Sequence, residues 1–486
     1  MTSKGIDAYI YLSGARQSAT IHARNHKGRK FAGDAAPDAG RMQSHSFELS
    51  RGDIKIWEKS GQLKLEGSVD GKSVFQRFAE INPVTGNIAD TDLGDMLNTR
   101  SVVKRDYAIN YGFADAGKGK RHQAWIYMTD SQANWMGRAI DKFGLMDRSF
   151  GTFVLPGSHD AGMFTGVASN SEAGSLMRSL VTAKMDNKLS KAGALATWLL
   201  SVRVAAEAGF LAAEKLGTVR KILIGLTYTQ KDTIATQLAL GTRYFDFRPG
   251  YNVPSYRKDK VLRMQHNFAP GSTFESFLSD IVKFLSRHKR EIVVAQIKFD
   301  GFADAGAMTP PAKEIDKHLK DALAGTGIVQ GGIGDLDRKV GDLLTESRRF
   351  IVLRDHDKPA DSYSDKAYAT DNPKDVVAAL DETLDAPRRN AKWTVLQLQG
   401  TYTNKIKAEW WTGPSLASMS DASSPLLSTK AKFDHKIYPW LMRKDTRFAE
   451  RAGPKLVVLL NDFVDNALSD HAFALTGQRA ARPARR

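Results

Sequence analysis

The chain has 486 residues, of which 42% are hydrophobic and 26% are charged, a composition typical of folded globular proteins. It contains no cysteine, which excludes disulfides, thiolate metal sites and cysteine nucleophiles. The formal net charge of +16 favours an anionic partner, such as nucleic acid, a phosphorylated substrate or an acidic membrane surface.

The pattern of basic residues and the N-terminus narrow the partners and the location. Lys and Arg are dispersed along the chain and no nucleic-acid-binding signature is present, so we expect no nucleic-acid partner. Residues 1–5 lead directly into polar, strand-like sequence without an apolar segment, so we expect no Sec-type signal. The compartment stays open: we expect a cytoplasmic protein, or one exported by a non-classical route, with peripheral membrane contact.

Residues 1–130 are predicted to form an all-β, sandwich-like accessory domain. Its short apolar or β-branched runs are separated by turn residues, as is typical of a sandwich. The alternation of Ile54 and Ile56 with Lys55 and Glu58 indicates a strand with one buried face. Binding of a lipid or glycan ligand, or targeting, is the functional interpretation, and a purely structural role is the alternative. The predicted strands are residues 8–12, 19–23, 46–49, 54–58, 63–69 and 73–78.

Residues 131–470 change to alternating helices and strands, beginning with an amphipathic helix over 135–146. Such alternation predicts a mainly parallel sheet, and seven or so strands with polar C-terminal ends favour a TIM-type (β/α) barrel, possibly distorted. The fold class is therefore α/β. The predicted strands are 153–155, 244–248, 261–264, 291–297, 350–353, 393–398 and 455–460, and the further helices are 234–240, 274–287, 315–323, 340–344 and 376–384.

A segment rich in Ala, Leu and Gly, residues 169–226, interrupts this pattern. Its most apolar part, 192–216, contains Arg203, Glu207 and Glu214, so we expect no transmembrane helix. We interpret it as a helical insertion of two packed helices that cover the barrel or its mouth, with a lipid-facing lid as the alternative.

The last residues, 471–486, are predicted to be a disordered basic tail. Attraction of the tail to lipid headgroups is the functional alternative. Its arginines are Arg479, Arg482, Arg485 and Arg486.

Polar residues follow most of the predicted barrel strands. Because the C-terminal ends of parallel strands meet at one mouth, we expect these residues to converge on an active site. Asp246 and Arg248 lie two apart in one strand and share a face, which suits either a buried ion pair or a phosphate clamp. The converging residues are His159, Asp246, Arg248, His266, Lys298, Arg354 and Asp462.

Three motifs resemble the X-domain of phosphatidylinositol-specific phospholipase C in their order and spacing. They are L-P-G-S-H-D at 155–160, G-T-R-Y-F-D-F-R at 241–248, and Q-H at 265–266. The resemblance covers residues 131–470. It implies a distorted TIM barrel that cleaves the phosphodiester of phosphatidylinositol into diacylglycerol and a cyclic inositol phosphate.

The resemblance also implies catalytic roles. His159 matches the general base that deprotonates the inositol 2-hydroxyl, and His266 matches the general acid that protonates the leaving glycerol oxygen. Asp462 matches the carboxylate that orients His159, while Asp465 is a weaker candidate because it falls later in the loop. Asp160 resembles the acidic residue that follows the first histidine in the bacterial enzymes.

The strand that carries Asp246 and Arg248 separates the two subfamilies. Calcium-dependent members have carboxylates at both positions, whereas here Arg248 occupies the second. An arginine repels calcium and can itself neutralise the pentacoordinate phosphorane. We therefore expect the metal-independent, bacterial-like mechanism, with no calcium and no other cofactor.

Three further residues are expected to bind substrate: Lys298, Arg354 and Gln399. Gln399, or Gln397, takes the position of a family aspartate that binds inositol hydroxyls, and this difference leaves the headgroup open. The expected partner is a phospholipid at a membrane surface. The alternatives are a phosphodiesterase for another lipid or glycerophosphodiester headgroup, and a non-catalytic protein that binds lipid or glycan.

Overall fold

We describe the protein from a computed structural model. The predicted strand at 54–58 and the predicted insertion at 169–226 lie outside the residues that the structure describes. The described ranges are 4–14, 16–25, 40–49, 61–81, 88–91, 99–114, 121–164, 227–251, 261–266, 269–302, 305–386, 390–400 and 426–482.

Two β-sheets form the N-terminal part of the protein, as predicted. In pairing order, the five-stranded sheet contains β3 (Arg41–Leu49), β1 (Lys4–Leu12), β9 (His122–Asp130), β8 (Tyr107–Ala114) and β7 (Val102–Val103). The four-stranded sheet contains β2 (Gln17–Asn25), β4 (Gly61–Val69), β5 (Lys72–Ile81) and β6 (Ile88–Thr91). Their inner faces share one hydrophobic core that includes Ile10, Leu65 and Ile126.

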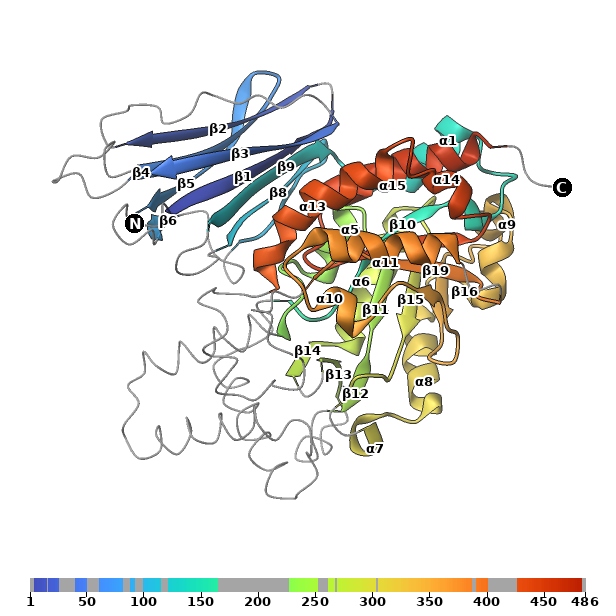
Figure 1. Ribbon diagram of the computed structural model, residues 1–486. Coiled ribbons are helices and arrows are strands. Elements are labelled where there is room, and N and C mark those ends of the chain that lie inside the picture. The colour runs from blue at the N-terminus through green and yellow to red at the C-terminus, as the bar shows by residue number, and fades with distance from the viewer. Residues whose placement is uncertain are drawn as a thin grey trace, which may run out of the picture.

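The five-stranded sheet is covered on its second face as well. Tyr9, Tyr11 and Tyr127 alternate with the residues of the first core and belong to the large hydrophobic cluster of the rest of the protein. That face packs against α13 (Leu427–Met442) and α15 (Asn466–Ala480), which Figure 1 shows in red beside the blue strands. The N-terminal sheets therefore bury apolar surface against the second half of the chain.

The second half is organised around a curved, eight-stranded parallel sheet that forms a distorted half-barrel. Its strands are apolar and buried, as expected of a parallel sheet that is covered on both faces. Among the described residues, the hydrogen-bonded order begins at β16 and ends at β18. In that order the strands are β16 (Gln330–Gly331), β17 (Phe350–Leu353), β15 (Val293–Ile297), β11 (Tyr244–Phe247), β10 (Val154–Ser158), β20 (Leu456–Asn461), β19 (Trp393–Gln397) and β18 (Ala360–Asp361).

Helices connect and cover these strands (Figure 1). α6 covers the full predicted range, and its first turn is capped by Thr273, whose Oγ1 accepts from Ser276 N at 3.1 Å. α1 is shorter than predicted, because Gly144 takes a left-handed conformation and ends the helix. The helices are α1 (Trp135–Phe143), α5 (Ile234–Ala239), α6 (Phe274–Arg287), α7 (Ala305–Met308), α8 (Ala312–Leu323), α9 (Val340–Thr345), α10 (Asp365–Tyr368), α11 (Pro373–Asp385) and α14 (Phe448–Arg451), with the 3-10 turns η2 (Phe150–Thr152) and η4 (Ile333–Asp337).

One predicted barrel strand belongs to another sheet. β13 (Leu262–His266) pairs antiparallel with β12 (Pro249–Tyr251) and β14 (Ala269–Thr273), outside the parallel sheet. His266 thus lies within a strand and not beyond its end. The connections that flank β13 are too short for a crossover helix, and a parallel pairing requires one.

The predicted basic tail was wrong for most of its length. Residues up to Ala480 belong to α15, which packs on β10, and Arg479 is buried. The Arg479 guanidinium donates to the carbonyl oxygens of Phe153, Gly453 and Lys455 at 2.8, 2.7 and 2.6 Å. The helix buries Leu468, Ala472 and Leu475. The burial of these apolar side chains, and not the positive charge of the arginines, therefore determines where the segment packs.

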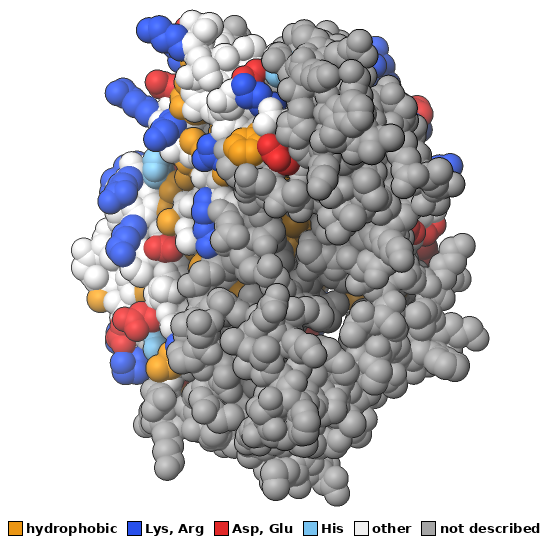
Figure 2. All heavy atoms as spheres, turned by 90° about the vertical axis from the view of Figure 1, so that its left-hand side faces the viewer, with side chains coloured by type: hydrophobic (Ala, Val, Ile, Leu, Met, Phe, Trp, Pro, Cys, Tyr) orange, Lys and Arg blue, Asp and Glu red, His pale blue; other side chains and the backbone are white. Residues whose placement is uncertain are grey.

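The surface of the N-terminal sheets is mixed in charge. Figure 2 shows Lys and Arg side chains at separate points of the described surface, among acidic, polar and hydrophobic ones. Among the described residues, no helix is both long enough and apolar enough to cross a membrane.

The contacts of α15 lead to a test of its role. We expect Arg479→Met to lower the free energy of unfolding by about 2–4 kcal/mol, because it removes the three hydrogen bonds of a buried guanidinium. Arg482→Met is the matched control, since that side chain is 45% exposed, and it should change stability by less than about 0.5 kcal/mol. Urea unfolding of both variants measures the difference, and equal stabilities would contradict the structural role of Arg479.

Candidate active site

Five of the predicted site residues lie at one edge of the parallel sheet. His159 follows β10, Asp246 and Arg248 lie at the end of β11, Lys298 follows β15 and Asp462 follows β20. Ser158 pairs with Phe245 on one side and with Asn461 on the other, so the register brings the next residues of all three strands together. The convergence expected from the strand-end pattern is present.

His159 is held by Asp462. Its Nδ1 lies 2.8 Å from Asp462 Oδ1, and its side chain is 19% exposed. Because a carboxylate only accepts, this contact assigns the hydrogen to Nδ1 and leaves Nε2 for the reaction. Burial alone would lower the pKa of His159, but the charges of Asp160 and Asp462 raise it to about 9.

Asp160 lies between the two histidines and is fully buried. Its Oδ2 is 3.6 Å from His159 Nε2 and 3.8 Å from His266 Nε2. The residue has a φ of 43°, a left-handed conformation that only a short polar side chain adopts at low cost. Burial would raise the pKa of Asp160, but Arg248 and the two histidines hold it well below its usual range.

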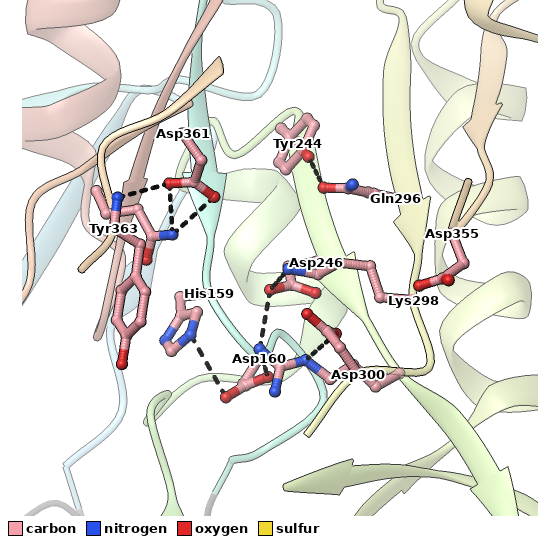
Figure 3. A network of polar contacts seen from close by, with 12 residues as sticks. His159, Asp160, Tyr244, Asp246, Gln296, Lys298, Asp300, Asp355, Asp361 and Tyr363 are labelled. Carbon is pink, nitrogen blue, oxygen red and sulfur yellow. Dashed lines mark hydrogen bonds and ion pairs between the residues drawn. The ribbon is translucent and has the colours of Figure 1, made fainter. Parts of the chain in front are cut away.

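Arg248 joins the carboxylates of this edge. Its Nη2 lies 3.0 Å from Asp160 Oδ1 and 3.4 Å from Asp246 Oδ2. Asp246 is also 2.9 Å from Lys298 Nζ, so two buried acids face two cations. Figure 3 shows His159, Asp160 and Asp246 next to one another, with Lys298 and Asp300 on the side away from His159.

His266 reaches the same edge from β13. Its Nδ1 lies 3.0 Å from the carbonyl oxygen of Thr227, which can only accept, so Nδ1 carries a hydrogen and Nε2 is turned to Asp160. Burial lowers the pKa of His266; Asp160 opposes this effect, while Arg248 and His159 add to it. The two histidines therefore differ in proton affinity although they share a carboxylate neighbour.

Three residues of the site are candidate ligands for a metal ion. His159, Asp160 and Asp246 each have one potential ligand atom within 4.8 Å of the others. Among the described residues, they form the candidate metal-binding group. Both carboxylates are already paired with Arg248 or Lys298, so a divalent cation there would stand beside two positive side chains. The donor set therefore fits a metal ion poorly.

Other predicted residues take different places. Arg354 pairs with Asp316 of α8 at 2.6 Å and not with the carboxylates of this network. Gln399 is buried and donates to Gln397 Oε1 at 2.6 Å. Asp465 does not contact His159; it caps α15 by accepting from Leu468 N at 2.7 Å.

Two residues of this edge were not predicted, Asp361 and Tyr363. Asp361 ends β18 and accepts from Gln397 Nε2 at 2.8 and 3.0 Å, and burial raises its pKa. Tyr363 is 51% exposed and stacks on Tyr368. Figure 3 shows both on the side of His159 opposite Lys298. A strand of two residues has no alternation to recognise, so the sequence held no signal for them.

Comparison with known proteins finds similarity among solved structures alone. No protein-family model matches the chain, and no curated protein matches it. A histidine-to-tyrosine mutant of the phosphatidylinositol-specific phospholipase C from Staphylococcus aureus has a TM-score of 0.39 and 16% identity, over 71% of this chain and 96% of that chain. The enzyme of the same name from Listeria monocytogenes has a TM-score of 0.38 and 12% identity, over 71% and 98%.

The charges around the histidines predict opposite protonation states. At pH 7 His159, with a pKa of about 9, should carry the extra proton, whereas His266, whose pKa is lowered, should be neutral. Titration of the imidazole signals by NMR measures both. In Asp462→Asn the His159 midpoint should fall by about one unit or more, since one stabilising charge is lost. A wild-type midpoint below 7 for His159 would contradict this electrostatic account.

Proposed function

We propose that this protein is a phosphodiesterase that cleaves phosphatidylinositol-type phospholipids by acid–base catalysis with His159 and His266. The observation that carries the proposal is the pair of imidazole Nε2 atoms that approach one buried carboxylate oxygen from two sides, at 3.6 and 3.8 Å. Each Nδ1 is held by an acceptor, so each ring exchanges protons through Nε2 alone. Two such groups can remove and deliver protons on opposite sides of one phosphate.

The proposed reaction is an intramolecular transfer. The neutral Nε2 of His159 takes the proton of the inositol 2-hydroxyl, and that oxygen forms a bond to phosphorus. His266 gives a proton to the glycerol oxygen as its bond to phosphorus breaks. The products are diacylglycerol and a cyclic inositol phosphate, and the pair is restored when the proton passes from His159 back to His266 through solvent or a second reaction.

Positive charge for the transition state would come from side chains. The guanidinium of Arg248 can present parallel donors to two phosphate oxygens, and its position is fixed by Asp160 and Asp246. Lys298 adds a second cation 2.9 Å from Asp246. Fixed charges of this kind stabilise the extra negative charge of a phosphorane without rearrangement.

The protonation states of His159 and His266 in the free protein determine how activity should depend on pH. His159 must lose its extra proton and His266 must gain one before the proposed step, so only a minor protonation form of the pair is productive at neutral pH. Activity should follow a bell-shaped curve between the two pKa values, which belong to the pair. A shape of this kind does not assign acid and base, so the roles need a separate test.

The headgroup is the second part of the proposal. By the resemblance, Gln399 or Gln397 takes the position of a family aspartate that binds inositol hydroxyls. This difference favours a phosphodiesterase for another lipid or glycerophosphodiester headgroup as the second candidate. Asp361 supplies a carboxylate to the same cluster and favours a polyol. The lipid or glycan ligand expected for the N-terminal sheets has no support among the described residues and is not part of the proposal.

The function and the roles can be tested in one set of assays. Purified protein should release diacylglycerol from phosphatidylinositol vesicles faster than the lipid products of phosphatidylcholine, phosphatidylglycerol or sphingomyelin vesicles. His159→Ala and His266→Ala should each lower this rate by about 100- to 10,000-fold, since each removes one proton-transfer group.

An inositol phosphodiester with a nitrophenol leaving group separates the two roles. This leaving group needs no proton, so His266→Ala should regain most of its activity and His159→Ala should not. Recovery of His159→Ala instead would reverse the assignment. Equal turnover by both variants and wild type on phosphatidylinositol would exclude the acid–base proposal.

A further inference from the structure

A short segment contacts all three elements that carry the acid–base groups. We name residues 227–232 the positioning segment. The carbonyl oxygen of Thr227 accepts from His266 Nδ1 at 3.0 Å, and Thr229 Oγ1 lies 3.0 Å from the carbonyl oxygen of His159. The loop that contains Asp462 donates back to the segment, from Phe463 N to the carbonyl oxygen of Thr229 at 2.7 Å.

Gln230 has the central place in this segment and is fully buried. Its Nε2 donates to the carbonyl oxygens of His159 at 2.9 Å and Asn461 at 3.2 Å, and its Oε1 accepts from Val464 N at 3.0 Å. Both amide hydrogens and one acceptor site are therefore used. One side chain thus connects the loop after β10 to both flanks of Asp462.

The other end of the segment is attached to the N-terminal sheets. Asp232 accepts from Ser101 N at 2.9 Å and from Ser101 Oγ at 2.6 Å, just before β7. Lys231 is buried, its Nζ lies 3.1 Å from Ser101 Oγ, and its carbonyl oxygen accepts from Arg100. In addition, Asn110 Nδ2 of β8 lies 3.3 Å from the carbonyl oxygen of Val464. The segment therefore bridges the N-terminal sheets and the active site.

We propose that Gln230 is a positioning residue that sets the His159–Asp462 hydrogen bond, and that the N-terminal sheets support it through Asp232 and Ser101. The sheets are then a part of the catalytic frame and not a separate module. The kinetic consequence rests on the proposed phosphodiesterase function, whereas the geometric one does not.

The size of the effect follows from geometry. Gln230→Leu keeps a side chain of similar size but removes all three bonds. The N–H of Val464 then loses its acceptor, and the carbonyl oxygens of His159 and Asn461 each lose one of two donors. Shifts of about 1 Å in a reacting pair can cost on the order of 100-fold in rate. We expect kcat to fall by about 10- to 100-fold with KM changed by less than about twofold, because Gln230 contacts no substrate.

A matched control exists in Gln132. It is also buried and makes three side-chain contacts, with Asp130, Thr129 and Arg138, but none with the active-site loops. Gln132→Leu should lose comparable stability and keep kcat. Ser101→Ala in the N-terminal part removes the contacts of Ser101 Oγ with Asp232, Lys231 and Asn110 but keeps the backbone N–H bond to Asp232. Because it touches no bond of Gln230, it should lower kcat in the same direction by a smaller factor.

The decisive readout is the proton NMR signal of His159 Nδ1–H in the full-length protein. A hydrogen bond to a carboxylate moves this signal far downfield. In Gln230→Leu the His159 Nδ1–H signal should move upfield or be lost to exchange with solvent. In Ser101→Ala the signal should move less, and in Gln132→Leu its position should not change. An unchanged signal in Gln230→Leu, or an equal shift in the control, overturns the proposal.

The two proposals fail in different ways. If wild type does not cleave phosphatidylinositol, the proposed function fails, and a changed signal in Gln230→Leu still supports the positioning role. If wild type cleaves the lipid and Gln230→Leu matches it in kcat and in the signal, the positioning role fails alone. If Gln230→Leu does not fold, the signal in Ser101→Ala decides between these outcomes.

Discussion

The ion pairs of Arg248 are the constraint on which the active site depends. Asp160 and Asp246 are both fully buried, and a buried carboxylate is stable only when opposite charge or donors compensate it. Arg248 lies within ion-pair distance of both, and Lys298 completes the balance. With these charges in place, Asp160 stays ionised between the two histidines and favours the protonated form of both. Their proton affinities differ because Asp462 also raises the pKa of His159, whereas Arg248 and His159 lower that of His266.

The sequence predicted those parts of the site that depend on strand ends. His159, Lys298 and Asp462 follow parallel strands, and Asp246 lies near the end of one. The edge of a parallel sheet brings such residues together. His266 was predicted to lie at the end of a barrel strand. It does reach the site, but from β13, which belongs to an antiparallel sheet. Arg354 also follows a strand, yet it pairs with Asp316, because the direction of a long side chain is set by neighbours that sequence spacing does not reveal.

Long-range partners explain most of what could not be predicted. Asp361 approaches Gln397 because β18 pairs with β19, and this pairing places Asp361 opposite Val395, 34 positions later in the chain. Basic composition gave the wrong expectation for the C-terminus, since Arg479 is neutralised by backbone carbonyl oxygens and carried by an apolar helix. The N-terminal sheets were expected to form an accessory domain. Their second face is buried against α13 and α15, so they contribute to the same core.

In the proposed reaction, Arg248 and Lys298 supply the positive charge that a metal ion would otherwise provide, and two histidines drive an intramolecular attack. The most direct measurement is a phosphorus NMR time course of phosphatidylinositol cleavage in excess EDTA, with wild type and Arg248→Met. The account predicts a cyclic phosphodiester as the first product of wild type, at a rate that EDTA leaves unchanged, and a rate at least about 100-fold lower for Arg248→Met. Turnover that stops in EDTA and returns with calcium, or a phosphomonoester as the first product, would contradict it.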